Sequence, residues 1–167
     1  MRYTLATVLF VAATLTAGAD DEKKYTSKDG KYAVQFPAGA KVKTDKQDAG
    51  GISINSALAE VEGKAFGVMY TLLPDAVKDV DPKLILDGAE KGAVEKSGGK
   101  LVKSKALAFG EKKFPGRDIL VEKDGNKVRT WVILAGTRLY VVLVGGKEDY
   151  ATGKEATAFL DSFEMTK

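Results

Sequence analysis

Several stretches of this chain alternate between apolar and polar side chains, the pattern of a β-strand with one face in a core. In residues 66–72, one face carries four apolar side chains, which are Phe66, Val68, Tyr70 and Leu72. Residues 131–134 and 139–144 are apolar on both faces. Strands that are covered on both sides lie in the middle of a sheet. We therefore expect these two segments to be central strands, with a helix packed on each face.

Glycine-containing pairs separate many of these strand-like segments. Three of them are Asp29-Gly30, Asp124-Gly125 and Ala135-Gly136. Such pairs supply the positive φ angles of tight hairpin turns. Three further strands are expected over residues 40–44, 52–61 and 100–109, and a loop is expected at Gly50-Gly51. Because tight turns join consecutive strands, the sheet is predicted to be mainly antiparallel.

A helix is predicted over residues 82–97. Asp81 is a favourable N-cap residue, and Pro82 takes the first helical position, where a missing N–H has no cost. Apolar side chains recur every three or four residues along the segment. Gly98-Gly99 follows, which is typical of a helix end.

A second helix is predicted over residues 153–163. Thr152 and Glu155 have the spacing of a capping box. An apolar stripe follows, made of Ala156, Phe159, Leu160 and Phe163. Such a stripe packs against another element. The order of elements predicts a single α+β domain over residues 20–167, a mainly antiparallel β-sheet between helices in an α/β/α-type sandwich.

The first nineteen residues have the pattern of a secretory signal peptide. A single positive charge at Arg2 precedes an apolar run, and Ala17 and Ala19 fill an A-x-A cleavage site. The run over residues 5–13 is shorter than the roughly 20 residues that a membrane-spanning helix needs. We expect cleavage after Ala19, no membrane insertion of the mature chain, and a location in a periplasm or outside the cell.

The charge pattern argues against a nucleic-acid partner. The formal net charge of the whole chain is +3, and lysines alternate with acids along its length. A nucleic-acid-binding protein concentrates basic residues on one face and interleaves them with aromatic residues. We interpret the lysines as solvated surface, and we expect a monomer.

The residue types exclude several catalytic arrangements. The chain contains no histidine and no cysteine, so it holds neither a Ser-His-Asp triad nor a thiolate nucleophile. Phosphate-binding glycine motifs are also missing from the sequence. Carboxylates remain, and three of them precede the first helix: Asp75, Asp79 and Asp81. Helix capping and solvation account for these acids better than a metal site does, so we assign no catalytic, cofactor or metal residues.

Five residues are candidates for a binding surface. Arg117 follows Phe114-Pro115-Gly116, which we interpret as a rigid turn. One interpretation is that the Arg117 guanidinium binds a carboxylate or phosphate of a partner. The other is that it pairs with a neighbouring acid of the same chain. The other four fall in predicted strands: Tyr70, Trp131, Arg138 and Tyr140. Aromatic and arginine side chains carry much of the energy of interfaces. These four either line a pocket or docking surface, or pack in the core.

Two segments resemble the PsbP-like fold family. Residues 30–37, with the sequence GKYAVQFP, are similar to the family's opening strand, which ends in proline. Residues 138–144, with the sequence RLYVVLV, are followed by a helix ending in FLDSF at residues 159–163, which is similar to the family's last strand and helix. The resemblance implies an antiparallel sheet between helices and a protein that binds a partner without transforming it.

Our leading hypothesis is an exported, non-enzymatic binding domain for a protein partner or small ligand of the cell envelope. One alternative is a carboxylate-dependent or metal-assisted hydrolase, which requires acids that converge in a cleft. Another is a carrier that holds an apolar ligand between sheet and helices, which requires a cavity of several hundred Å³. A docking module for proteins instead requires a large exposed apolar patch.

Overall fold

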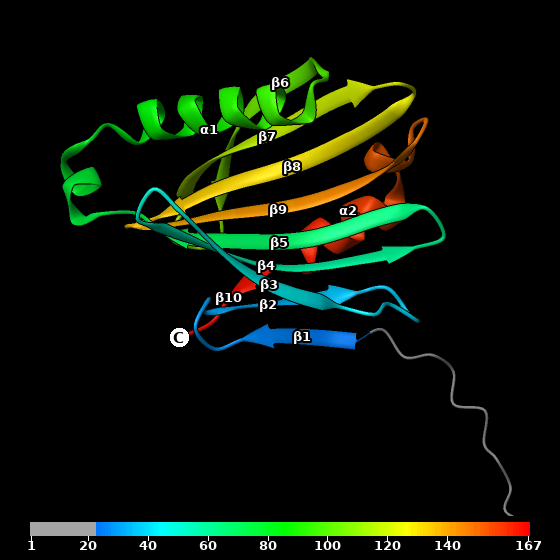
Figure 1. Ribbon diagram of the computed structural model, residues 1–167, viewed down its shortest axis with the longest axis horizontal. Coiled ribbons are helices and arrows are strands. Elements are labelled where there is room, and N and C mark those ends of the chain that lie inside the picture. The colour runs from blue at the N-terminus through cyan, green and yellow to red at the C-terminus, as the bar shows by residue number, and fades with distance from the viewer. Residues whose placement is uncertain (1–22) are drawn as a thin grey trace, which may run out of the picture.

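The computed structural model describes residues 23–167 (Figure 1). The predicted signal peptide, residues 1–19, lies outside the described residues. A seven-stranded antiparallel sheet forms the centre of the molecule. Its strands, in spatial order, are β3 (Lys43–Ala49), β4 (Ile52–Val61), β5 (Lys64–Leu72), β9 (Arg138–Lys147), β8 (Asn126–Ala135), β7 (Phe114–Lys123) and β6 (Lys100–Phe109). The two segments that are apolar on both faces belong to β8 and to the central strand β9, as predicted.

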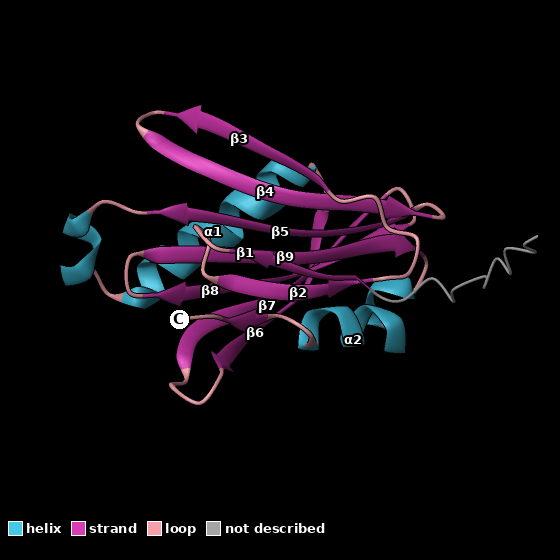
Figure 2. Ribbon diagram, turned by 90° about the horizontal axis from the view of Figure 1, so that it is seen from below, coloured by secondary structure: helices cyan, strands magenta, loops and turns pink. Residues whose placement is uncertain are grey.

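Different elements cover the two faces of this sheet (Figures 1 and 2). Helix α1 (Pro82–Ser97) lies over β7 and β8. The opposite face is covered by α2 (Lys154–Asp161) and by a small antiparallel sheet of β1 (Lys23–Ser27), β2 (Tyr32–Phe36) and β10 (Glu164–Met165). Two short 3₁₀ helices, η1 (Asp75–Asp79) and η2 (Tyr150–Thr152), complete the chain. The α+β class and the antiparallel sheet are confirmed, and a helix lies on each face of the large sheet. The small sheet that shares one face with α2 is not predicted by the sequence.

Two hydrophobic cores result from this arrangement. The larger one lies between the two sheets and α2 and includes Tyr32, Val34, Phe36, Phe66, Val68, Trp131, Tyr140, Phe159 and Leu160. The smaller one lies under α1 and contains Leu86, Ile119, Val121, Val132 and Leu134. Strand β8 contributes to both cores because successive side chains point to opposite faces of a strand. In the second sheet, Tyr32, Val34 and Phe36 occupy alternate positions along β2, so all three point to one face and are buried in the larger core.

The predicted first helix is confirmed as α1, with the expected bounds. The Asp81 side chain accepts a hydrogen bond of 2.9 Å from the Lys83 backbone N–H. Gly98 ends the helix with a φ of 61°, the left-handed conformation that glycine adopts without a steric cost. Local capping signals therefore located both ends of this helix.

The predicted second helix is confirmed as α2, but its predicted capping box is wrong. Helix α2 begins at Lys154, one residue after the predicted start, and ends at Asp161, two residues before the predicted end. Gly153 occupies the N-cap position without a side-chain cap. The Thr152 hydroxyl donates to the Asp149 carbonyl oxygen at 2.9 Å, and Glu155 pairs with Lys64 of β5. No capping box forms, because Thr152 belongs to the 3₁₀ helix η2 and its hydroxyl bonds within that turn. The apolar stripe is confirmed, since Ala156, Phe159, Leu160 and Phe163 are buried.

Two other local predictions also need correction. The segment 40–44 is not one strand, because β3 begins at Lys43 and ends at Ala49; Gly50-Gly51 then forms a hairpin turn, with φ angles of 59° and 81°. Residues 114–118 are not a turn but the start of β7. Gly116 is required there because a Cβ atom would lie 2.5 Å from the Val132 carbonyl oxygen of β8.

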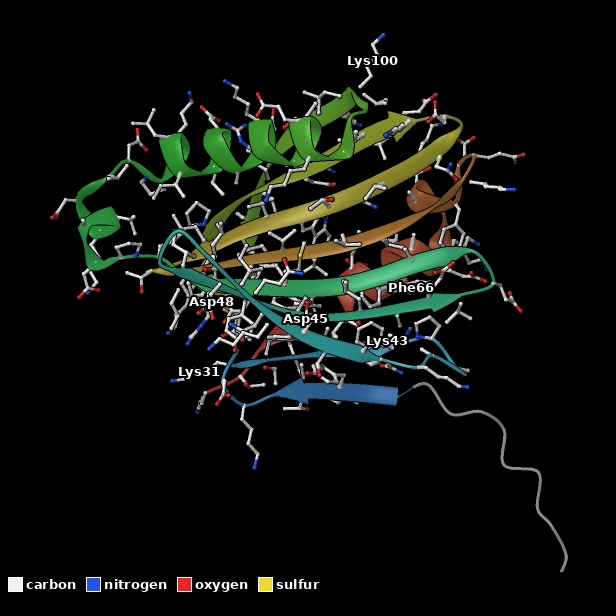
Figure 3. All side chains as sticks on the ribbon, in the orientation of Figure 1. Lys31, Lys43, Asp45, Asp48, Phe66 and Lys100 are labelled. Atoms are coloured by element: carbon white, nitrogen blue, oxygen red, sulfur yellow. The ribbon has the colours of Figure 1, made fainter. Side chains whose placement is uncertain are left out.

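Both edges of the large sheet carry exposed charges. Lys43, Asp45 and Asp48 lie along β3, and Lys100 begins β6 (Figure 3). Charged side chains on edge strands oppose pairing with a second chain. Among residues 23–167, no helix has the length and apolar character that crossing a membrane requires.

Candidate functional site

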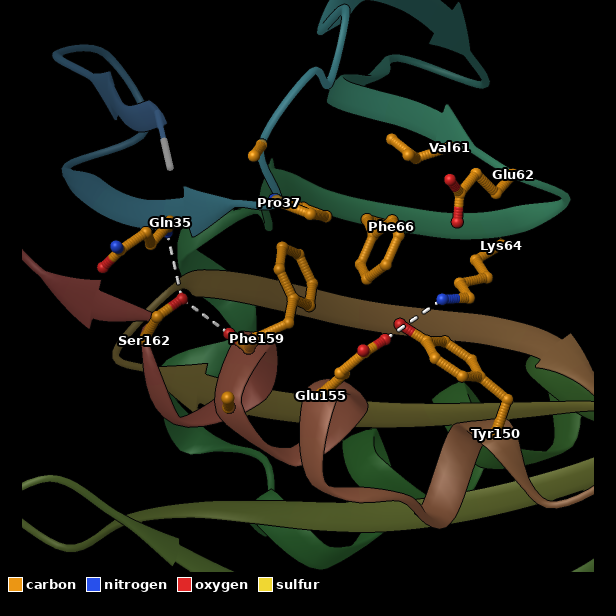
Figure 4. A pocket seen from close by; sticks show the side chains of 12 residues that line it. Gln35, Pro37, Val61, Glu62, Lys64, Phe66, Tyr150, Glu155, Phe159 and Ser162 are labelled. Carbon is orange, nitrogen blue, oxygen red and sulfur yellow. Dashed lines mark hydrogen bonds and ion pairs between the residues drawn. The ribbon is translucent and has the colours of Figure 1, made fainter. Parts of the chain in front are cut away.

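A pocket of about 460 Å³ opens at one end of the sandwich, between β5 and α2 (Figure 4). Its walls come from the end of β2 and the turn after it, from the β4–β5 hairpin, from η2 and from α2. The lining residues are Gln35, Pro37, Ala38, Val61, Glu62, Lys64, Phe66, Tyr150, Glu155, Ala158, Phe159 and Ser162. We call this the α2 pocket. Its size falls within the range of small-molecule sites, about 300–1,000 Å³.

Aromatic rings form the base of the α2 pocket. Phe66 and Phe159 are almost fully buried, and their ring centroids lie 5.2 Å apart. The Tyr150 ring meets Phe66 edge to face, with centroids 6.2 Å apart. Phe66 points here because it shares a face of β5 with the buried Val68, and Phe159 belongs to the apolar stripe of α2. The base is therefore an extension of the larger core, which holds the rings in place.

One ion pair spans the mouth of the pocket. Lys64 Nζ lies 3.1 Å from Glu155 Oε2 and 4.7 Å from the centroid of the Tyr150 ring (Figure 4). The hydrogen bond and charge of Lys64 lower the pKa of the Glu155 carboxyl. Burial, together with the neighbouring Glu155, raises the pKa of Tyr150 to about 12. At neutral pH the pocket thus presents an ammonium, a carboxylate and an un-ionised phenol.

A second carboxylate borders the same pocket. Glu62 lies in the β4–β5 turn with a φ of 51°, followed by Gly63 with a φ of 73°. Within the described part of the chain, no cation pairs with Glu62. The charged lining residues are Glu62, Lys64 and Glu155, so the lining carries one excess negative charge.

Hydrogen bonds hold the pocket wall at the point where the end of α2 meets β2. Ser162 Oγ accepts a hydrogen bond of 3.0 Å from the Gln35 backbone N–H and donates one of 2.7 Å to the Phe159 carbonyl oxygen. These bonds tie the end of α2 to β2 (Figure 4). The pocket wall is consequently held by backbone partners from two elements.

A second, more polar cleft lies between the β1–β2 hairpin and the β3–β4 hairpin. Its volume is about 560 Å³. It is lined by Tyr25, Ser27, Asp29, Tyr32, Thr44, Asp45, Lys46, Asn55, Ser56 and Tyr70. We call it the hairpin cleft. Burial raises the pKa of Tyr70, as does the nearby Asp29 carboxylate, so its lining is mainly neutral hydroxyl and amide groups with a few surface charges.

Of the predicted site residues, Arg117 pairs with acids of its own chain. Its guanidinium contacts the Asp87 carboxylate of α1 and lies 3.9 Å from Glu90 Oε2. Lys83, followed by Arg117, lowers the pKa of Asp87. Arg117 therefore pairs with neighbouring acids and is not free to bind a carboxylate or phosphate of a partner. It lies on the face of the sheet opposite the α2 pocket.

The other four predicted residues lie in or beside the larger core. Trp131 and Tyr140 are 8% and 2% exposed, so they do not form an outer docking surface. The Tyr140 hydroxyl donates to the Gly30 carbonyl oxygen at 2.7 Å, and the Arg138 guanidinium donates to the Asp29 carbonyl oxygen at 3.4 Å. Tyr70 alone among the five lines one of the two cavities, the hairpin cleft.

The acids before α1 do not assemble a site. Asp81 caps the helix, and Asp75 pairs with Lys78 at 2.8 Å. Across residues 23–167, no group of three or more acidic side chains has the arrangement of a metal site. This segment therefore does not supply the converging acids that the hydrolase alternative requires.

The residues of the α2 pocket were missed at the level of sequence. Phe66 and Phe159 were recognised only as core positions, and Glu155 was assigned to a capping box. Lys64 and Glu155 are 91 positions apart, and no local pattern connects them. The only usable signal was the apolar stripe of α2, which indicated that this helix packs against the sheet.

Similarity to known proteins lies in the fold. No known family model matches the sequence, and no curated protein sequence matches it. The structure is similar to the solution structure of cyanobacterial PsbP (CyanoP) from Synechocystis sp. PCC 6803, with a TM-score of 0.61 and 13% sequence identity. The match covers 93% of this chain and 98% of that chain. The resemblance found in the opening and closing segments is confirmed: this protein has the PsbP-like fold.

Proposed function

We propose that this protein is an exported, non-enzymatic binding domain that holds a small amphipathic ligand in the α2 pocket. The observation that carries the proposal is the pocket itself, about 460 Å³ with a base of buried aromatic rings. Pockets for small molecules combine an apolar lining with a few polar groups that set orientation. The signal-like residues 1–19 support export to a periplasm or the cell exterior.

The charges in the pocket favour binding over catalysis. A general acid or base works best with a pKa near the operating pH. Here the pKa of Glu155 is lowered by Lys64 and that of Tyr150 is raised to about 12. Neither group is ready to exchange a proton near pH 7, whereas both are suited to hold a ligand by fixed charge and ring contacts.

The α2 pocket fits a ligand-binding role better than the hairpin cleft does. The cleft is lined mainly by polar side chains, which water satisfies at little cost. The pocket lining includes the half-buried side chains of Pro37, Val61 and Tyr150, whose remaining apolar surface gains free energy when an apolar group replaces water. A ligand with an apolar body and a polar head matches this lining.

Binding of the neutral fluorescent probe N-phenyl-1-naphthylamine to the whole exported protein tests the proposal. Ala158 is exposed on α2 and lines the pocket, so Ala158→Trp fills the space without opening the core. We expect saturable binding by the wild type and at least a tenfold loss in Ala158→Trp. The matched control is Lys154→Trp, on the same helix outside the pocket, which should bind as the wild type does. Equal binding by Ala158→Trp, or no binding by the wild type, contradicts the proposal.

A further inference from the structure

We infer that the α2 pocket selects organic cations with an apolar body, such as alkylammonium or quaternary ammonium compounds. This inference rests on the proposed function and adds the chemical class of the ligand. It comes from the position of the Lys64 ammonium, which shows how the protein itself places a cation at the mouth of the pocket.

Lys64 lies against both an aromatic ring and a carboxylate of the pocket. Its Nζ lies 4.7 Å from the centroid of the Tyr150 ring and 3.1 Å from Glu155 Oε2. A cation within about 6 Å of an aromatic face is attracted by the ring, and aromatic surroundings of this kind recognise quaternary ammonium groups. The Tyr150 ring and the Glu155 carboxylate therefore form a cation seat, which Lys64 occupies from within the chain.

The charge balance of the pocket favours a cationic ligand. Glu155 already neutralises Lys64, so an anionic ligand has to displace Glu155 before it gains a partner. Glu62 remains at the rim with no cation among the described residues. An anionic head meets this carboxylate and is repelled, whereas a cationic head gains from it.

Apolar side chains of the pocket lie close to its charged groups. Phe66 and Phe159 lie beside the cation seat, and the half-buried Pro37 and Val61 line the same pocket (Figure 4). A ligand with an alkyl or aryl body can place that body on Pro37 and Val61 while its head stays beside Glu62. Both parts of the ligand class thus have a matching part of the pocket.

Three probes of equal chain length separate the alternatives: octyltrimethylammonium, octanol and octyl sulfate, each titrated calorimetrically below its micelle concentration into the whole protein. We expect the cation to bind about threefold more tightly than octanol, because the Glu62 carboxylate attracts its head, with octyl sulfate weakest. Added salt should weaken cation binding and leave octanol binding unchanged, because screening acts only on the charged head.

Single substitutions test which charged groups of the pocket select the cation. Glu62→Gln should weaken cation binding about threefold and leave octanol binding unaltered. Glu60→Gln removes the same charge from an exposed position on the opposite face of β4, outside the pocket, and should change neither. Lys64→Met keeps the length of the side chain but vacates the cation seat, so the cation should bind about fivefold more tightly.

The outcomes distinguish the two proposals. If octanol binds but the cation binds no more tightly, or if octyl sulfate binds best, the inference about charge is overturned while the proposed function stands. The inference is also overturned if Lys64→Met binds the cation less tightly than the wild type. If none of the three probes binds, the pocket is not a site for amphipathic ligands and both proposals fail.

Discussion

The α2 pocket and the hairpin cleft have similar volumes but opposite linings. Strands β4 and β5 contribute to both: Val61 and Phe66 reach the pocket from one end of the pair, and Asn55 and Tyr70 reach the cleft from the other. The pocket has a base of buried rings, whereas the cleft is lined with hydroxyl, amide and charged groups. The comparison teaches that cavity volume does not by itself indicate a ligand; the gain on binding depends on the surface that loses water.

The largest expected effect comes from removing an aromatic ring at the base of the pocket. Phe159 is 4% exposed and packs against Phe36 and Phe66. Phe159→Ala should lower the free energy of unfolding by about 4 kcal/mol, because it leaves a cavity in the core. Urea denaturation measures this change.

Tyr70→Phe in the hairpin cleft is the matched comparison, since it keeps the ring and removes only a hydroxyl. It should lower the free energy of unfolding by less than about 1 kcal/mol. Equal effects of the two substitutions would show that the base of the pocket is not part of the core.

An intermediate effect is expected from the ion pair that supports α2. Arg129 donates two hydrogen bonds to Asp118, at 2.9 and 2.8 Å, and a third to the Thr157 hydroxyl of α2 at 3.2 Å. Asp118 and Arg129 side chains are 7% and 16% exposed. Asp118→Asn should lower the free energy of unfolding by about 3 kcal/mol at pH 7, because it leaves Arg129 without its charged partner.

The pH dependence of stability gives an independent measure of this pair. Burial alone raises the pKa of Asp118, but Arg129 and Lys105 more than offset it, so the folded-state pKa is below the unfolded one. The contribution is therefore present at neutral pH and is lost as the pH falls through the ordinary aspartate range and then the lower folded-state pKa. Asp118→Asn should show a shallower loss of stability with acid; an unchanged acid profile would contradict this role.

A smaller effect is expected at the β1–β2 turn, which borders the hairpin cleft, and it should not change the α2 pocket. Tyr140→Phe removes the hydroxyl that donates to Gly30 in the β1–β2 turn. The loss of this buried hydrogen bond should lower the free energy of unfolding by about 1 kcal/mol. Binding of N-phenyl-1-naphthylamine in the α2 pocket should be unchanged, because neither residue lines it. Weaker probe binding in Tyr140→Phe would indicate that the two cavities are coupled.

Elements with strong local signals were predictable from sequence. Strands 52–61 and 100–109 and helix 82–97 were expected with the bounds that the structure has. Alternation of side chains along a strand, and caps at the ends of a helix, are properties of neighbouring residues. They need no information about distant parts of the chain.

The errors occur where distant residues compete with a local signal. Thr152 and Glu155 have the spacing of a capping box, but Glu155 pairs with Lys64. Pro115 and Gly116 have the composition of a turn, yet both belong to β7 because this segment pairs with β6 and, from Gly116 onwards, with β8. In both cases the tertiary neighbour decides.

The α+β class, the antiparallel pairing, the central strands, the amphipathic second helix and the resemblance to the PsbP-like fold all follow from local patterns in the sequence. Three features follow only from the packed structure: a second sheet shares one face with α2, Trp131 and Tyr140 are interior, and Lys64 meets Tyr150 and Glu155. The physical reason is that hydrophobic periodicity depends on adjacent positions, whereas a pocket depends on how separate elements pack. Its residues become neighbours only when the apolar faces of β5 and α2 are buried together.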